Sequence, residues 1–230
     1  MREEQKNWRK KRMTFETDKN IGGIGAILLF IGLIPYGEPF LGIIALIGFI
    51  MVLIALHGLA DYYKEQRIFN NALYGFITTI AGGVAAIGTA IYIAFYTTIF
   101  TNFLYKIYPS WNGKYSSLAG MTPTLTGITS SDVAPIIGAV FGILAITWIF
   151  LIIATFFDRR SLKTLGTKAN VGLFSTAGLL LLIGAILTIV FIGFLLMWIA
   201  ILLMIIAFFQ LKPQAEATPS QPPPPQPQAV

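Results

Sequence analysis

The sequence predicts an all-α fold, a polytopic bundle of about six transmembrane helices. Apolar residues make up 56% of the 230 residues, charged residues only 11%, and the mean hydropathy is +0.75. A soluble fold needs more charge to cover its surface, whereas helices that face lipid need almost none. The apolar residues also gather in separate stretches long enough to cross a bilayer.

The lysines and arginines fall on one side of these stretches. Fourteen of the sixteen lie in the N-terminal arm, in two alternate connections or in the tail, and only Lys106 and Lys114 lie on the other side. This bias is the positive-inside signal, and it predicts that both termini are cytoplasmic. The fourteen are Arg2, Lys6, Arg9, Lys10, Lys11, Arg12, Lys19, Lys64, Arg67, Arg159, Arg160, Lys163, Lys168 and Lys212.

Composition also limits the chemistry. The formal net charge of +6 sits beside membrane segments, so we expect the lipid bilayer as a partner and no nucleic acid. The chain has no cysteine, which excludes disulfide bonds, thiolate metal sites and cysteine nucleophiles. One histidine makes no metal site, and no enzyme motif occurs, so we expect no catalytic residue, no metal and no cofactor.

Six spans are expected, arranged as two hairpins with two central helices between them. Pro35 and Pro39 form a turn after the first span, which is short for a hydrocarbon core of about 30 Å. The apolar run 171–210 is too long for one span, so we expect a minimal turn between Thr188 and Gly193. The expected spans are about 21–35, 40–60, 72–98, 133–157, 171–188 and 192–210.

Local patterns predict the ends and contacts of these helices. The helical pattern of the third span continues to Tyr108 through an aromatic outer end. We expect Ser131 or Asp132 to cap the fourth span and Asn170 to cap the fifth. Small residues four positions apart let helix backbones approach closely, and they predict contacts at two pairs, Gly82 with Ala86 and Gly138 with Gly142.

The segments outside the spans differ in character. Residues 1–20 form a basic cytoplasmic arm with a few apolar side chains, which either binds anionic lipid or acts only as a topology determinant. The inner connections are 61–71 and 158–169, and the single long outer loop is 109–131. Residues 212–230 are rich in proline and cannot bury a core, so we expect a disordered cytoplasmic tail.

Ionisable residues are absent from the middle of the expected spans. The carboxylates next to the second and fourth spans lie at span ends or in the outer turn, where we expect water to reach them: Glu38, Asp61, Asp132 and Asp158. His57 precedes Asp61 by one helical turn, so the two share a face. Asn70 and Asn71 follow at the entrance of the third span. These four residues, His57, Asp61, Asn70 and Asn71, are the candidate binding or partner cluster at the inner mouth.

Several pieces of the first half resemble a known family. They are Ile34-Pro35-Tyr36-Gly37-Glu38-Pro39, the stretch 47–56, Ala60-Asp61-Tyr62-Tyr63 and Ile68-Phe69-Asn70-Asn71-Ala72-Leu73-Tyr74. On these residues the chain is similar to an uncharacterised, mainly archaeal family of multi-pass membrane proteins, domain of unknown function 996. The resemblance implies an archaeal plasma-membrane protein. It assigns no functional residue, because the family has no established activity.

We therefore expect an integral membrane protein that is not an enzyme. It would act as a scaffold or interaction protein whose inner loops and tails bind lipid, protein partners or a second copy of the chain. The alternative is a small-solute or ion transporter or channel with a path lined by Thr, Ser and Gly. The scaffold is favoured because the spans carry no buried charge and no sign of discontinuous helices.

Overall fold

The computed structural model describes residues 2–34, 39–96 and 98–213, and within them the chain is helical with no strand. The expected turn at 35–39 and the proline-rich tail therefore lie almost wholly outside the described residues. The helices are α1 (Arg2–Gly32), α2 (Pro39–Tyr63), α3 (Arg67–Tyr96), α4 (Thr98–Ile107), α5 (Ser130–Ala169), α6 (Gly172–Leu187) and α7 (Ile192–Gln210). The short turns η1 (Tyr115–Leu118) and η2 (Thr188–Val190) complete the described structure.

Five of the described helical segments are long and apolar enough to cross a membrane. The sixth expected span lies in α1, which is not among these five segments. The all-α bundle of about six spans is thus confirmed. The five segments are Phe40–Tyr63, Arg67–Phe95, Ser130–Ala169, Gly172–Val190 and Ile192–Gln210.

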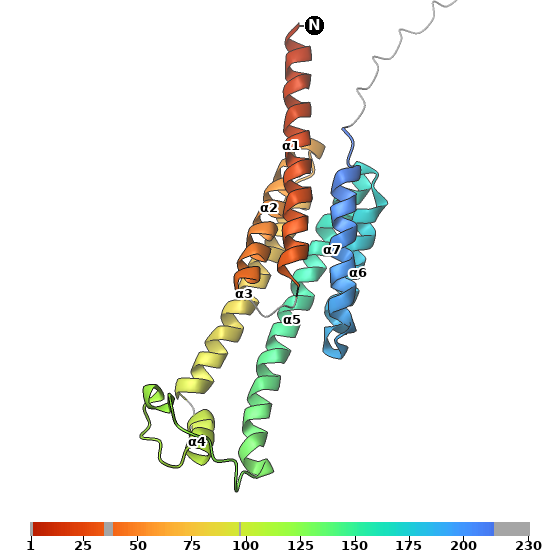
Figure 1. The fold of residues 1–230 in the computed structure, drawn as a ribbon. Coiled ribbons are helices and arrows are strands. Elements are labelled where there is room, and N and C mark those ends of the chain that lie inside the picture. The colour runs from red at the N-terminus through yellow and green to blue at the C-terminus, as the bar shows by residue number, and fades with distance from the viewer. Residues whose placement is uncertain (1, 35–38, 97, 214–230) are drawn as a thin grey trace, which may run out of the picture.

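The helices pack as three antiparallel hairpins, α1 with α2, α3 with α5, and α6 with α7 (Figure 1). The two expected central spans thus pair with each other. The start of α1 and the end of α7 lie at one end of the bundle, and α4 lies at the other. We name the first the inner end, which also holds the connection 64–66 and the junction at Asn170, and the second the outer end.

Two hydrogen bonds from tryptophan fix neighbouring hairpins to each other. The Trp198 indole on α7 donates to the Phe30 carbonyl of α1 at 3.1 Å, and the two rings stack with centroids 4.3 Å apart. The Trp148 indole on α5 donates to the Ala185 carbonyl of α6 at 3.0 Å. These bonds satisfy indole donors that lipid could not satisfy.

Residues 158–169, predicted as an inner connection, are helical, because α5 continues to Ala169. Leu162 and Leu165 lie three positions apart on the face of α5 toward the bundle, and both are buried. Their packing stabilises the helix beyond the basic residues. Asn170 ends α5 in a left-handed conformation with φ 55°, rather than capping α6. Asparagine is among the few residues that adopt this conformation readily.

The expected outer features are mostly found. The turn between Thr188 and Gly193 is formed by η2 and by Phe191, and helix continues on both sides of the undescribed position 97 to Ile107. Thr129, rather than Ser131 or Asp132, is the N-cap of α5, and Asp132 completes a capping box with it. The outer loop is held against α3 by the Tyr115 hydroxyl, which donates to the Ala94 carbonyl at 2.7 Å.

The tightly packed core lies at the inner end. Its largest fully buried side chains include Phe15 of α1, Ile68 of α3, Leu165 of α5 and Phe208 of α7. The Phe15 ring lies 4.5 Å from the Tyr62 ring, so the arm and the first span form one helix whose middle belongs to the bundle. The Asp-Tyr-Tyr and Ile-Phe-Asn-Asn pieces of the sequence both lie beside this core.

Glycine allows the closest backbone approach in the first hairpin. A Cβ built on Gly48 would lie 2.6 Å from the Gly25 carbonyl oxygen, and one on Gly25 would lie 2.8 Å from the Gly48 carbonyl oxygen. Gly82 packs against Phe150 of α5, as expected of a contact position. Gly138 and Gly142 face open space in the described structure, so the predicted close contact there is wrong.

We expect Gly48→Ala to destabilise the protein, because the added methyl meets backbone that no rotamer change can move. The cost of overpacking of this kind is about 1–3 kcal/mol. Gly83→Ala is the matched control, since a Cβ at Gly83 has no neighbour within 4 Å and alanine favours helix. The measurement is the thermal unfolding midpoint of both variants in detergent. Equal stability of Gly48→Ala and wild type would contradict the close approach of the α1 and α2 backbones.

Candidate functional site

The inner ends of α3 and α5 are held together by a buried hydrogen bond, beside the short connection 64–66 that joins α2 to α3. Lys64 ends α2 in a left-handed conformation with φ 53°, and the Glu65 amide donates to the Ala60 carbonyl at 2.9 Å. The Ser161 hydroxyl of α5 is buried and donates to the Ile68 carbonyl at 2.6 Å. Together these contacts place the first turn of α3 beside the last turns of α5.

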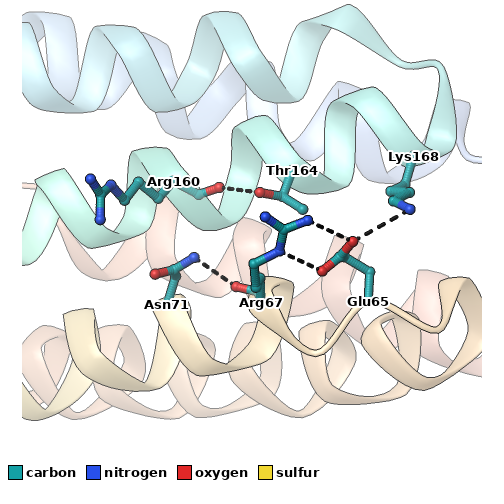
Figure 2. A network of polar contacts seen from close by, with 6 residues as sticks. All are labelled: Glu65, Arg67, Asn71, Arg160, Thr164 and Lys168. Atoms are coloured by element: carbon teal, nitrogen blue, oxygen red, sulfur yellow. Dashed lines mark hydrogen bonds and ion pairs between the residues drawn. The ribbon is translucent and has the colours of Figure 1, made fainter.

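A basic pocket of about 500 Å³ opens between these two helix ends. Four basic side chains line it against a single carboxylate, Glu65. The pocket carries an excess of positive charge at the level where the membrane spans end. Figure 2 shows the network that its polar contacts form. The lining residues are Glu65, Arg67, Asn71, Arg160, Lys163, Thr164, Thr167 and Lys168.

Glu65 holds the connection to both helices. Arg67 donates two hydrogen bonds to its carboxylate, at 2.7 and 3.1 Å, and the Lys168 ammonium lies 3.4 Å from it (Figure 2). The Arg67 guanidinium first, and Lys168 second, lower the pKa of Glu65 from its ordinary 4.5 to about 2. Glu65 is therefore ionised over the physiological range and neutralises part of the charge of these two residues.

Arg160 and Lys163 are the cations of the pocket that this carboxylate does not engage. Arg160 lies over the Phe156 ring, 4.5 Å from its centroid, and in Figure 2 its side chain extends away from Glu65. Among the ion pairs of the described residues, none involves Arg160 or Lys163. Both side chains are exposed at the inner end.

The structure does not gather the four predicted site residues into one pocket. His57 and Asp61 share a face of α2, with His57 Nδ1 3.7 Å from Asp61 Oδ2, and both side chains are more than half exposed. Asp61 also accepts a hydrogen bond from Gln66, and the His57 ring contacts Phe69 edge to face. This pair stands at the junction of α2 and α3.

The two asparagines, Asn70 and Asn71, lie in different surroundings. Asn71 alone of the four lines the basic pocket, and its side-chain amide donates to the Arg67 carbonyl at 2.8 Å. It thereby fixes the first turn of α3 from which Arg67 projects. Asn70 is exposed on α3 and does not line the pocket.

Asp18 is a titratable neighbour that the sequence analysis missed. It lies on α1 with its carboxyl against Gly58 of α2, only 9% exposed, and its Oδ2 has no hydrogen-bond partner among the described residues. Burial raises the pKa of the Asp18 carboxyl above its ordinary value, and the charge of Asp61 raises it further, while His57 opposes both. The α1–α2 contact thus carries a carboxyl next to the His57–Asp61 pair.

Asp158 does not lie in bulk water, contrary to the expectation for a span end. It is half-buried on α5, its carboxyl contacts Gly75 of α3, and it lines a cavity inside the bundle. The described residues contain no group of three or more metal-ligating side chains of the His, Cys, Asp and Glu type.

A family model matches residues 44–202, which is more than half of the chain and includes the whole basic pocket. The chain belongs to the family described as protein of unknown function DUF996. This DUF996 chain is also 26% identical over 200 residues to an uncharacterised protein of the archaeon Methanocaldococcus jannaschii, covering 87% of the chain and 94% of the relative. No solved structure matches it.

The pKa of Glu65 predicts how stability depends on pH. Because its folded value lies below its ordinary value, the Glu65 contacts stabilise the protein fully above about pH 4.5, and this contribution falls as the pH drops toward 2. Glu65→Gln should remove this part of the acid sensitivity. The measurement is the unfolding midpoint against pH for wild type, Glu65→Gln and the neighbouring control Lys64→Gln. Parallel profiles for wild type and Glu65→Gln would contradict the assignment.

Proposed function

We propose that this membrane protein is a non-enzymatic scaffold whose inner end binds the phosphate headgroup of an anionic lipid. The supporting observation is the basic pocket, in which one cationic side chain of α3 and three of α5 surround the Glu65 carboxylate. Basic pockets between transmembrane helices are typical sites for anionic headgroups, and each basic residue near an anionic surface contributes about 1 kcal/mol.

The arrangement of the cations supports a phosphate as the ligand. Glu65 holds Arg67 and Lys168 in place, while Arg160 and Lys163 project from α5 as donors for a second anion. A guanidinium presents paired donors that match phosphate oxygens, and an ammonium adds a point charge. Thr164 and Thr167 line the same pocket, but their hydroxyls donate to the Arg160 and Lys163 carbonyls of the preceding turn.

The proposal includes the orientation of the chain. With the inner end in the cytoplasm of the cell, both termini and the basic pocket face the anionic inner leaflet of the plasma membrane. The distribution of lysine and arginine supports this orientation. Protein partners or a second copy of the chain would then assemble on the exposed inner surface, and the arm of α1 would add lipid contacts.

The transporter alternative receives less support. Threonines that could line a polar path instead donate to carbonyl oxygens of the preceding turn in their own helix, which leaves few hydroxyls for a solute. Flux of solute or ions through the reconstituted protein, abolished by His57→Ala or Asp61→Asn, would favour the transporter over the scaffold. The threonines with such bonds are Thr78, Thr79, Thr147, Thr155, Thr176 and Thr188.

The orientation is tested by cysteine labelling, because the chain has no native cysteine. Cysteine in place of Ser117, in the outer loop, should react with an impermeant reagent added outside the cell. Cysteine in place of Thr167, in the basic pocket, should react only after the membrane is opened. Labelling of both from the same side would contradict the proposed orientation.

Lipid binding is tested by paired variants of equal charge. We expect Arg160→Gln/Lys163→Gln to lower the retention of phosphatidylglycerol by about tenfold, since two charges near the ligand are lost. The control Lys64→Gln/Arg159→Gln removes two inner cations that do not line the pocket and should retain the lipid. Native mass spectrometry of the full chain released from nanodiscs counts the bound lipids.

Two outcomes would contradict the proposal. Equal loss of lipid in the two double variants would mean that only the total inner charge matters. Displacement of the lipid by millimolar inorganic phosphate, with no preference for phosphatidylglycerol over phosphate, would mean that the pocket serves a soluble anion instead. A zwitterionic lipid, phosphatidylcholine, serves as the reference for unspecific retention.

A further inference from the structure

A second site lies inside the bundle, where the three hairpins meet. A cavity of about 340 Å³ is lined by residues of α1, α2, α3, α5, α6 and α7. Its wall is almost entirely aliphatic and aromatic, and includes Phe49 of α2, Leu151 of α5 and Met204 of α7. Ligand pockets in proteins occupy about 300–1,000 Å³ and are mostly apolar with a few placed polar groups, so this cavity has the size and character of one.

Of the polar side chains in the cavity wall, one is an acceptor without a hydrogen-bond partner among the described residues. The hydroxyls of Thr79, Thr155 and Ser161 each donate to a backbone carbonyl at 2.6–3.1 Å and so are already engaged. The Asp158 carboxyl has no hydrogen bond or ion pair among those of the described residues. A carboxyl in an apolar wall without a partner is costly, so it marks a place for a donor.

We propose that the cavity binds a small apolar molecule that presents one hydrogen-bond donor, an ammonium or a hydroxyl group, to Asp158. Water alone does not suit the cavity, because an ordered water needs two to four polar partners and the wall offers a carboxyl at one end only. Leu33 and Leu46 line the opposite part and are 47% and 44% exposed, so the ligand enters from the bilayer side.

This site is separate from the basic pocket. Successive residues of a helix turn by about 100°, which puts Asp158, Ser161 and Leu162 on one face of α5 and Arg160 and Lys163 on the other. The cavity contains the first set and the pocket the second. The inference therefore does not rest on the proposed lipid headgroup site, and the two can be tested independently.

Three probes of equal shape test the proposal: 4-phenylbutylamine, 4-phenylbutanol and pentylbenzene, which end in an amine, a hydroxyl and a methyl group. The dependence of the thermal unfolding midpoint on probe concentration gives an apparent Kd for the purified full chain in nanodiscs. We expect the amine or the alcohol to bind wild type at least about tenfold more tightly than pentylbenzene, because only they can donate to Asp158.

Variants separate the donor contact from the cavity itself. Asp158→Leu should remove the preference for the amine and the alcohol while pentylbenzene still binds, because leucine has nearly the shape of aspartate but no hydrogen-bond acceptor. Gly42→Leu should weaken all three probes, because Gly42 lines the cavity and a Cβ there has no neighbour within 4 Å. Gly83→Leu adds the same side chain in open space away from the cavity and should bind as wild type does.

Four results would overturn the inference. The first is equal affinity of wild type for the three probes, and the second is a donor preference that survives in Asp158→Leu. The third is binding that Gly42→Leu leaves unchanged. An alkyl chain of a co-purified lipid that occupies the cavity and that no probe displaces would also overturn it, and mass spectrometry of the purified protein detects that lipid.

Discussion

The packing of α3 against α5 is the contact on which the rest of the structure depends. The two helices contact each other from the inner end, where Lys168 pairs with Glu65, to Gly82, which packs against Phe150. At the outer end the Lys106–Asp132 ion pair joins α4 to α5. Two hydrocarbon surfaces gain little by leaving lipid for each other, so close backbone approach at small residues and buried hydrogen bonds must hold them. The other two hairpins then pack on this pair, with α6 against α5 and α2 against α3, and they meet each other where α7 packs against α1.

This contact also explains why polar chemistry gathers where it does. Because α5 continues as a helix to Ala169, its basic residues form one face, and that face meets the connection that begins α3. The opposite face of the same turns carries Asp158 into the apolar cavity. One helix therefore presents cations to the headgroup level and a carboxyl to the interior. A connection of irregular backbone could not have kept these two sets of side chains apart.

The sequence predicted what depends on local composition and missed what depends on neighbours. The helical bundle, the turn after Thr188 and the helical continuation toward Tyr108 follow from hydrophobic runs and were found. Residues 158–169 looked like a connection because they are basic, and only the burial of Leu162 and Leu165 against other helices makes them helical. Of the four predicted site residues, only Asn71 lines the pocket. The i, i+3 and i, i+4 spacing of Arg160, Lys163 and Thr164 could have indicated the rest, had the segment been taken as a helix.

A structure of the full chain in nanodiscs that contain phosphatidylglycerol tests the central claim most directly. The account predicts α5 as a continuous helix to Ala169, with headgroup density between the inner ends of α3 and α5 and phosphate oxygens within hydrogen-bond distance of Arg160 and Lys163. A break in α5 near Asp158, or headgroups ordered elsewhere on the inner surface while this pocket stays empty, would contradict it.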